Sequence, residues 1–472
     1  MGTLVGVLPG VGPISAIAIL LPVSFRMSPV AAIILLAGIY YGAMYGGSTT
    51  SILVNIPGEA ASVVTCLDGY EMAKQGRAGP ALGIAAFGSF IAGTLGLLGL
   101  ILFAAPLAEF GLQFGPPEFF GVLLLGLMLV TSLSRGSVTK AILTGCLGLI
   151  LSTIGLDPIL GSPRMTFNRM QLWDGVGLVP LSMGLFGIAE VLINIERAEN
   201  PEILKTKIKS FLPTLSDWIK STGAILRGTV LGFFIGLLPG GAPPMASFLS
   251  YGVEKKISKS PEMFGRGAIE GVAGPEAANN ATTSGAFIPF FTLGIPTTVS
   301  MALLLGALLI HGLRPGPLLL TKRPDLFWGV VSSMYIGNTM LLILNLPLIP
   351  LWVQVLKVPY RILFPLILLF CIIGAYSINN STFDVIVMMI FGLVGYLLRK
   401  FEYEGAPLIL AFVLGSMFEI NLRQSLLFSE GSFFIFFTRP ISAITVTAAL
   451  ILLAASIIPF FTRRKGKHRA LT

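Results

Sequence analysis

The densest polar segment of this chain interrupts otherwise apolar sequence. It reads EAANNATTSG from Glu276 to Gly285, and a second polar segment, YGGSTTS from Tyr45 to Ser51, is followed by Asn55. At a break in a helix, hydroxyl, amide and free carbonyl oxygens can coordinate Na⁺, and the N–H groups at the start of a half-helix can bind a carboxylate. Both segments are therefore candidates for binding an ion and an anionic substrate.

Close helix packing is the alternative role for these residues. Ser, Thr, Gly and Asn let neighbouring helices approach closely, and for most of these residues taken singly we favour that role. Because the two segments occupy matching positions beside breaks in the chain, we favour binding for them as groups. The candidate substrate- and ion-binding residues, including those at the breaks, are Pro9, Gly10, Ser48, Thr49, Thr50, Asn55, Pro57, Gly240, Glu276, Asn279, Asn280, Thr282, Thr283, Ser284, Pro296 and Thr297.

Acidic residues flank both segments. Glu59 directly follows the Pro-Gly of one break, where it either caps a helix N-terminus or takes part in binding. Glu270 and Glu276 are candidate sites for a coupling ion or a proton, because an acid in so apolar a setting costs much free energy. Residues 68–77 contain both acidic and basic side chains, Asp68 among them, and this stretch predicts a solvated loop.

The sequence lacks the residue constellations typical of enzymes. Its three cysteines, Cys66, Cys146 and Cys371, are scattered and fit neither a disulfide nor a metal spacing. Clustered metal ligands, a nucleophile beside a base and a phosphate-binding loop are all absent from the sequence. We therefore expect the chain not to be an enzyme.

Composition places the chain in the membrane. Hydrophobic residues make up 54% of its 472 residues and charged residues 11%, whereas soluble proteins carry about a quarter charged residues. This predicts an all-α polytopic membrane protein with about ten to twelve transmembrane segments. The net charge of +9 does not indicate nucleic-acid binding, because the basic residues lie in loops and in the tail. Clear spanning candidates are Pro29–Ala43, Pro80–Ala105, Phe119–Leu133, Val138–Ile154, Val176–Ile195, Leu326–Ile349, Tyr360–Ser377, Phe383–Leu398, Pro407–Phe418 and Ile441–Phe461.

An internal repeat organises these segments. GVLPGVGP at 6–13 returns as GLLPGGAP at 236–243, and Pro and Gly at such positions break helices. NIPG at 55–58 is matched by GIPT at 294–297, so each half contains two breaks. Matched interruptions in two halves indicate the substrate site of a transporter. We expect two homologous halves, 1–197 and 222–430, joined by a connecting loop at 198–221 and followed by a terminal helix and basic tail at 431–472.

The charge distribution predicts the orientation. The basic C-terminal tail and the Lys-rich 198–221 loop are expected to be cytoplasmic by the positive-inside rule. The apolar limbs Gly228–Leu238 and Met245–Val253 are each too short to cross a bilayer, which predicts a re-entrant hairpin entering from the cytoplasm. We expect the first half to be inverted relative to the second. Only Met1–Val7 precede the first break, which predicts that an N-terminal helix is missing.

Long motifs throughout the chain are specific enough to compare with a known family. They are GVLPGVGP at 6–13, YYGAMYGGSTTSIL at 40–53, NIPGE at 55–59, EGVAGPEAANNA at 270–281, LGIP at 293–296 and GLRPGP at 312–317. Together they resemble, over nearly the whole chain, the large membrane subunit of the tripartite tricarboxylate transporters, the TctA family.

The resemblance implies a multi-pass carrier of the bacterial inner membrane. It would import citrate-like tricarboxylates or related carboxylates together with Na⁺ or H⁺, with no other cofactor. Its implied partners are a small membrane subunit of the TctB type and a periplasmic solute-binding protein of the TctC type. A channel or scaffold subunit and an integral-membrane enzyme are the alternatives, and the duplicated breaks favour the carrier.

Overall fold

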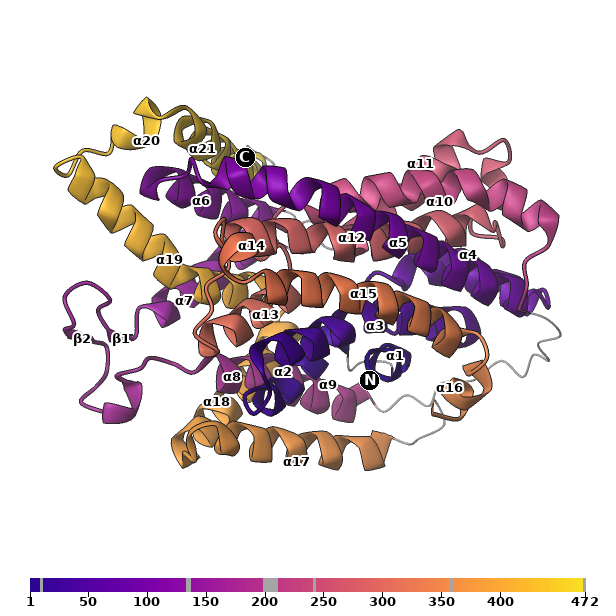
Figure 1. Cartoon of the computed structure of the whole chain (residues 1–472), viewed down its shortest axis with the longest axis horizontal. Helices are drawn as coiled ribbons and strands as arrows, with labels where there is room; N and C mark the ends of the chain where they lie inside the picture. Colours follow the sequence, from indigo (N-terminus) through magenta and orange to yellow (C-terminus); the bar gives the residue numbers. More distant parts are fainter. Residues whose placement is uncertain (9–11, 133–136, 198–210, 241–242, 356–359, 470–472) are drawn as a thin grey trace.

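The computed structural model describes residues 1–8, 12–132, 137–197, 211–240, 243–355 and 360–469, and these residues are almost wholly helical (Figure 1). Two short strands, β1 (Gly155–Leu156) and β2 (Pro163–Arg164), pair antiparallel. The helices up to the connecting loop are α1 (Gly2–Val7), α2 (Gly12–Ser24), α3 (Pro29–Val54), α4 (Val63–Lys74), α5 (Ala78–Gly111), α6 (Pro116–Ser132), α7 (Val138–Ser152), η1 (Met170–Leu172), α8 (Leu178–Ser182), the π-helix η2 (Met183–Ile188) and α9 (Ala189–Arg197).

The helices after the loop begin with α10, which is longer than the apolar limb predicted there. α10 runs over Leu215–Gly236, and a capping box of Thr214 and Asp217 starts it. The remaining helices are α11 (Pro243–Ile257), η3 (Pro261–Met263), α12 (Glu270–Leu293), α13 (Val299–Ile310), α14 (Leu319–Lys322), α15 (Pro324–Asn345), α16 (Ile349–Val355), α17 (Tyr360–Asn379), α18 (Thr382–Lys400), α19 (Ala406–Phe428), α20 (Ile435–Thr438) and α21 (Pro440–Arg469).

The prediction of an all-α polytopic membrane protein is confirmed. Within the described residues, six helices are long and apolar enough to cross a membrane: α3, α5, the continuous α8–η2–α9 helix, α15, α18 and α19. Six shorter apolar helices, of 10 to 17 residues, accompany them. Each span expected from the sequence overlaps one of these helices. The number of crossings, the re-entrant hairpin and the cytoplasmic tail stay predictions.

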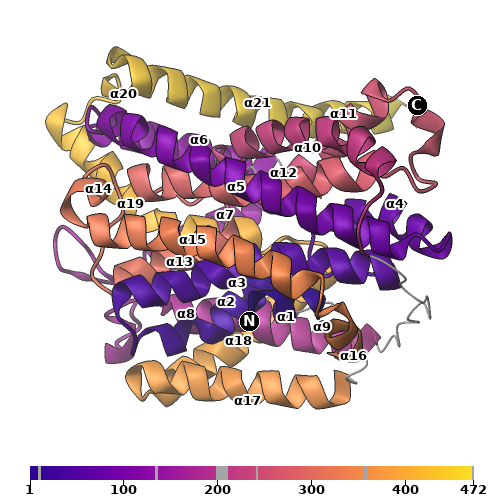
Figure 2. The ribbon, with the colours of Figure 1, turned by 45° about the vertical axis from the view of Figure 1, so that its right-hand side comes forward.

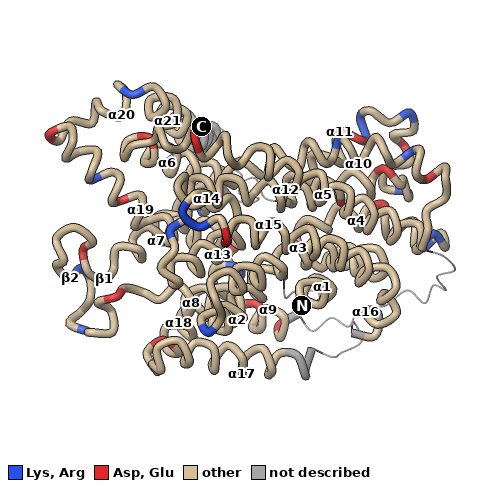
Figure 3. The backbone as a smooth tube through the Cα atoms, in the orientation of Figure 1, with Lys and Arg blue, Asp and Glu red and all other residues tan. Residues whose placement is uncertain are grey.

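The helices lie in roughly parallel layers, with α21 along one face and α17 along the opposite face (Figure 2). Long stretches of α5, α15 and α17 carry no charge, and charged residues gather in the loops around the α10–α11 end and around the β1–β2 hairpin (Figure 3). This distribution fits a bilayer, because charges at its centre are costly and collect at its borders.

Elements from the two halves of the chain pack between one another. After each Leu-Pro-Gly break comes a helix, then a long polar-centred helix, an Ile-Pro break and a short helix. The long helix of the first half, α3, packs against α1 and against α15 of the second half. Its counterpart α12 packs against α10 and against α5 of the first half. Each central helix therefore touches both halves, while homology and inversion of the halves stay predictions.

Glycines permit close contacts between α10 and α12 and between α1 and α3. A Cβ added at Gly228, Gly232 or Gly236 of α10 would lie within 2.1–2.4 Å of backbone oxygens of α12. In α1, a Cβ at Gly2 or Gly6 would lie 2.4 or 2.2 Å from a backbone oxygen of α3. Spacing of four residues places these glycines on one helix face, where they permit close approach of the backbones. The same packing thus recurs at both Leu-Pro-Gly elements.

An ion pair joins the two arms of the α10–α11 hairpin. The Arg227 guanidinium donates from Nε and Nη2 to both carboxylate oxygens of Glu254, at 2.9 and 2.6 Å. The two residues lie at similar distances in sequence from the break at Gly240, so the arms run antiparallel. Glu254 is 2% exposed, and this bidentate pairing compensates its buried charge.

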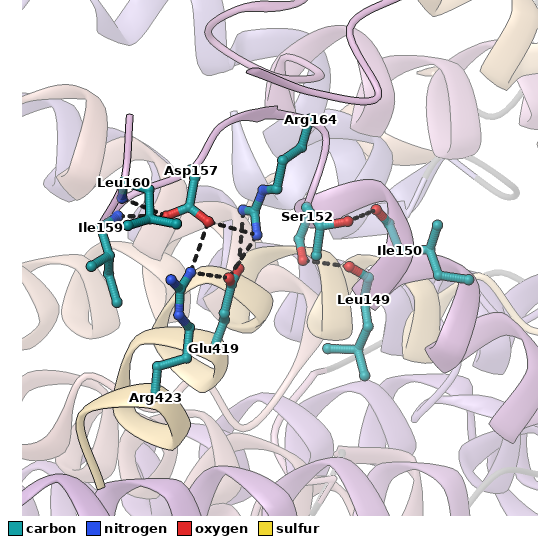
Figure 4. Close-up of polar contacts among 10 residues, drawn as sticks. Leu149, Ile150, Ser152, Asp157, Ile159, Leu160, Arg164, Glu419 and Arg423 are labelled. Atoms are coloured by element: carbon teal, nitrogen blue, oxygen red, sulfur yellow. Dashed lines mark hydrogen bonds and ion pairs between the residues drawn. The ribbon is translucent and has the colours of Figure 1, made fainter. Parts of the chain in front are cut away.

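A second charged cluster fixes the loop that carries β1 and β2 (Figure 4). Asp157 accepts hydrogen bonds from the Ile159 and Leu160 N–H groups at 2.8 Å each and pairs with Arg423 of α19 at 2.8 Å. Arg164 of β2 donates to both oxygens of Glu419, at 2.6 and 3.1 Å. These contacts tie the loop to α19.

Candidate functional site

The two polar segments lie inside continuous helices, ahead of the Ile-Pro breaks that end those helices. Residues Tyr45–Ser51 belong to α3, which continues to Val54, and Glu276–Gly285 lie in the middle of α12. Pro275 and Pro289 stand within α12 without ending it. The hydroxyl groups bond to carbonyls of the preceding turn, and this arrangement is compatible with a continuous helix.

Several predicted binding hydroxyls bond to backbone carbonyls instead of facing a cavity. Thr50 donates to Gly47 at 3.1 Å and Thr283 to Asn280 at 2.7 Å. Thr282 bonds within α12 to Ala278 at 2.7 Å and across to Gly232 of α10 at 3.0 Å. Ser284 reaches Gly93 of α5 at 3.5 Å. These contacts support helix packing, the alternative role considered for them.

The chain breaks, in contrast, meet around one large cavity of about 950 Å³. Its wall includes Gly12 beside the first Leu-Pro-Gly break, Pro57–Glu59 of the first Ile-Pro break, Gly240, and Thr297 of the second Ile-Pro break. Three predicted residues, Pro57, Gly240 and Thr297, therefore line one space although they are far apart in sequence. Pro9 and Gly10 lie outside the described residues. A volume of several hundred Å³ is typical of small-molecule sites.

Each of the four chain breaks is followed by a helix that begins at this cavity, and α19 also begins there, at Ala406. The wall contains Gly12–Ser15 at the start of α2, Val63 at the start of α4, Pro243–Met245 at the start of α11, and Val299–Ser300 at the start of α13. Each helix has at least 12 residues and its N-terminus carries a partial positive charge from the peptide dipoles. First-turn N–H groups have no carbonyl partner within their own helix. Exceptions here are Pro13, Pro243 and Pro244, which have no N–H, and Met301, whose N–H donates to Thr298 Oγ1 at 3.2 Å. The convergence of four N-termini makes the cavity suited to an anion.

The two breaks of the second half contact each other at the cavity wall. Gly240, in the left-handed backbone region at φ +80°, donates its N–H to the Thr297 carbonyl at 2.9 Å. The Thr297 side chain is fully buried, and its Oγ1 has no hydrogen-bond partner among the described residues. A buried hydroxyl without a protein partner is uncommon in folded proteins, so this one, in a residue of the cavity wall, is a candidate for binding a ligand. Pro296 is buried and is not among the residues that line the cavity.

Two buried carboxylates lie beside the cavity. Glu59, 7% exposed, is part of its wall and accepts hydrogen bonds from the Ala61 N–H at 2.6 Å and from Asn279 Nδ2 at 3.3 Å. Ala61 precedes Ser62, the N-cap residue of α4, which has no side-chain cap bond, so a capping role of Glu59 stays a prediction. Glu276, 1% exposed, accepts from Ser48 Oγ at 2.6 Å and from the Thr65 hydroxyl. Among the predicted residues, Ser48 thus bonds to Glu276 and Asn279 bonds to Glu59, and the two carboxylates interact electrostatically as one network.

The other predicted residues lie at the edges of this network. Asn280 donates to Ser89 Oγ of α5 at 2.7 Å and to the Glu276 carbonyl at 3.0 Å. Thr49, together with Ser48 and Ser89, lines a separate small cavity of about 10 Å³, room for one water. Asn55 ends α3 in the left-handed conformation at φ 58° and is exposed.

Sequence reasoning missed three features of the region. Glu190 and Arg399 form an ion pair at the cavity wall, and Tyr40 of α3 lines it as well. The two charges lie at the ends of separate apolar helices, and nothing in either segment predicts the partner.

Asp68, expected in a solvated loop, is fully buried in α4. It accepts from the N–H groups of Gly265, Gly267 and Ala268 at 2.8 Å each and from the Tyr251 hydroxyl at 2.9 Å.

Comparison with known proteins gives the family. The sequence pattern of the Tripartite tricarboxylate transporter TctA family matches residues 1–410. An uncharacterized 52.8 kDa protein in the TAR-I ttuC' 3' region of Agrobacterium vitis is 48% identical over 467 residues, covering 99% of this chain and 93% of that protein. An uncharacterized protein in the TAR-II ttuC' 3' region of the same organism is 51% identical over 236 residues, half of this chain and 98% of that protein. No solved structure matches. The chain belongs to the tripartite tricarboxylate transporter TctA family and is a multi-pass membrane subunit of such a transporter.

Proposed function

We propose that this chain is the large transmembrane subunit of a secondary carrier that imports citrate-like tricarboxylates or related carboxylates. The observation that carries the proposal is the convergence of four helix N-termini and the unbonded Thr297 hydroxyl on one cavity. Backbone N–H groups and helix dipoles bind carboxylates without a full positive charge, so the anion can also leave.

The charge of the cavity wall supports this role for the backbone. Among the described residues that line the cavity, Arg399 is the one basic side chain, and it is ion-paired with Glu190. Side-chain charge therefore does not explain anion binding, and the helix N-termini are the main source of positive potential.

The remaining parts of the proposal follow from family membership. The carrier works with a small membrane subunit of the TctB type and receives substrate from a periplasmic binding protein of the TctC type. Import is coupled to a gradient of Na⁺ or H⁺, and the protein resides in the bacterial inner membrane with its C-terminus in the cytoplasm. A channel or scaffold role is disfavoured, because neither role requires four chain breaks, each followed by the start of a helix, around one cavity.

Uptake of labelled citrate into proteoliposomes tests the proposal. We expect uptake to require the small subunit, the binding protein loaded with citrate and an inward cation gradient. Uptake that persists unchanged after both the Na⁺ and H⁺ gradients are collapsed would rule out ion coupling. Equal citrate flux in both directions without the binding protein would favour the channel.

A pair of threonine variants tests the location of the site. Thr297→Val keeps the side-chain shape and removes the unbonded hydroxyl at the cavity wall, so we expect citrate affinity to fall about tenfold, the loss of one hydrogen bond to a charged group. Thr283→Val is the matched control, because its hydroxyl is bonded within α12. Equal affinities in both variants would place the substrate elsewhere.

A further inference from the structure

The buried carboxylate of Glu59 has an unusual position for a site that attracts anions. It lies on the wall of the cavity where the helix N-termini converge, and it is 7% exposed. A charged Glu59 would repel a carboxylate substrate in the same cavity, and the low local dielectric would make this repulsion strong. Substrate and a charged Glu59 therefore disfavour each other.

Among the described residues, no cation is paired with Glu59, because Arg399, the basic side chain of the cavity wall, pairs with Glu190. Its described hydrogen-bond donors, the Ala61 and Ser62 N–H groups and Asn279 Nδ2, are neutral. Glu59 interacts electrostatically with Glu276 of α12 and with Tyr40 of α3. Glu276 in turn interacts electrostatically with Tyr45 and Cys66. The other charged groups at the cavity wall are the Glu190–Arg399 pair and Glu404. A buried carboxylate that faces a second carboxylate is ionised at a large cost unless it binds a cation.

The Asn279 amide can form a hydrogen bond with Glu59 in either protonation state of Glu59. Its Nδ2 donates to Glu59 Oε1, while its buried Oδ1 has no partner among the described residues. If the amide rotates by half a turn, Oδ1 faces the same carboxyl oxygen and accepts a hydrogen bond from a protonated Glu59. The donors around Glu59 are N–H groups, whereas a sodium ion requires several oxygen ligands. The environment therefore fits a proton better than Na⁺.

We propose that Glu59 is the proton-carrying group of this transporter and that its protonation is linked to substrate binding in the adjacent cavity. This inference rests on the proposed function. A proton from the outer solution binds a Glu59 carboxylate oxygen, which forms an O–H bond and removes the negative charge. The neutral acid then tolerates a carboxylate beside it, and both are released on the inner side. Each bound substrate thus favours one bound proton, and each proton favours substrate by the same factor.

The test is citrate binding to the purified full chain between about pH 6 and about pH 8. In the wild type, affinity should weaken with rising pH by up to about tenfold per unit beyond the titration of citrate itself. Glu59→Gln mimics the neutral acid, so it should lose this additional pH dependence. The pH dependence that comes from the ionisation of citrate itself is the same in both proteins and should remain. Glu59→Asp keeps a carboxylate and should keep the slope. Glu109→Gln, at an exposed position of α5, is the matched control and should behave as the wild type.

Three outcomes overturn the proposal. The first is an unchanged slope in Glu59→Gln, and the second is loss of the slope in Glu276→Gln alone. The third is an affinity of the wild type that depends on Na⁺ and not on pH, with that dependence lost in Glu59→Gln. Infrared difference spectra between the two pH values give a readout without substrate. A protonated-carboxyl band present in the wild type and absent in Glu59→Gln supports the proposal even if citrate does not bind, which would refute only the proposed substrate.

Discussion

Replacement of Gly232 by alanine should loosen the contact between α10 and α12. The new Cβ would lie 2.1 Å from the Ala278 carbonyl oxygen and 2.7 Å from two other backbone atoms of Ala278, whereas real Cβ contacts essentially never fall below 3.0 Å. Because all three neighbours are backbone atoms, no side chain can rotate away, and the helices themselves must separate.

The expected loss combines three contributions. Overpacking costs about 1–3 kcal/mol, and a weakened Thr282–Gly232 hydrogen bond costs about 0.6 kcal/mol. The higher helix propensity of alanine returns about 1 kcal/mol. The net destabilisation is therefore about 0.5–2.5 kcal/mol. Since α12 carries Glu276 and Asn279, the same shift should also disturb their contacts with Ser48 and Glu59.

Thermal unfolding of the purified protein in detergent, followed by tryptophan fluorescence, measures this effect. Gly252→Ala is the matched control, because it lies in the neighbouring helix α11 and a Cβ there meets nothing within 4 Å. We expect Gly232→Ala to lower Tm by several degrees and Gly252→Ala to leave it unchanged or raise it. If the two variants unfold at the same temperature, the close α10–α12 contact is not as described.

Two further predictions concern the charged clusters. Arg227→Met should destabilise the protein in thermal unfolding, and adding Glu254→Gln should recover most of the loss, because the cost is an unpaired carboxylate that is 2% exposed; no recovery would show that packing of the arginine stem matters more. Hydrogen bonds from the Leu160 N–H and from Arg423 hold the pKa of Asp157 well below its usual range. Because this pKa is lowered on folding, ionised Asp157 stabilises the loop at pH values above the ordinary aspartate pKa. The stabilisation is lost as the pH falls through the pKa of Asp157 in the folded protein, so the protection of the Ile159 and Leu160 amides from hydrogen exchange should decrease in acid. Asp157→Asn should lack this dependence, and equal acid sensitivity in both proteins would contradict the assignment.

The helix pattern and the breaks could be predicted from the sequence, whereas the contacts between segments could not. Pro and Gly in apolar sequence act locally, so Pro57, Gly240 and Thr297 were identified and do line the cavity. A hydroxyl side chain can form its hydrogen bond either with a carbonyl of its own helix or with a ligand, and the sequence does not distinguish these two cases. The residues around Thr283 illustrate this ambiguity.

Asp68 and Glu59 show the same limit for charged residues. Asp68 lies among nearby charges in the sequence, yet its partners are backbone N–H groups about two hundred residues away. The role of Glu59 as a cap was one of two readings open from the sequence. Its place on the cavity wall depends on how α3, α12 and the break residues pack, which no local pattern encodes.

The packing of each central helix between the two halves has a consequence for biogenesis. The small-residue face of α5 that receives α12 is made long before its partner exists. Synthesis at roughly 5–20 residues per second leaves on the order of ten seconds between the end of α5 and the start of α12. During that interval lipid or an insertion chaperone must cover this face. The nascent first half therefore waits in the membrane as an incomplete folding intermediate.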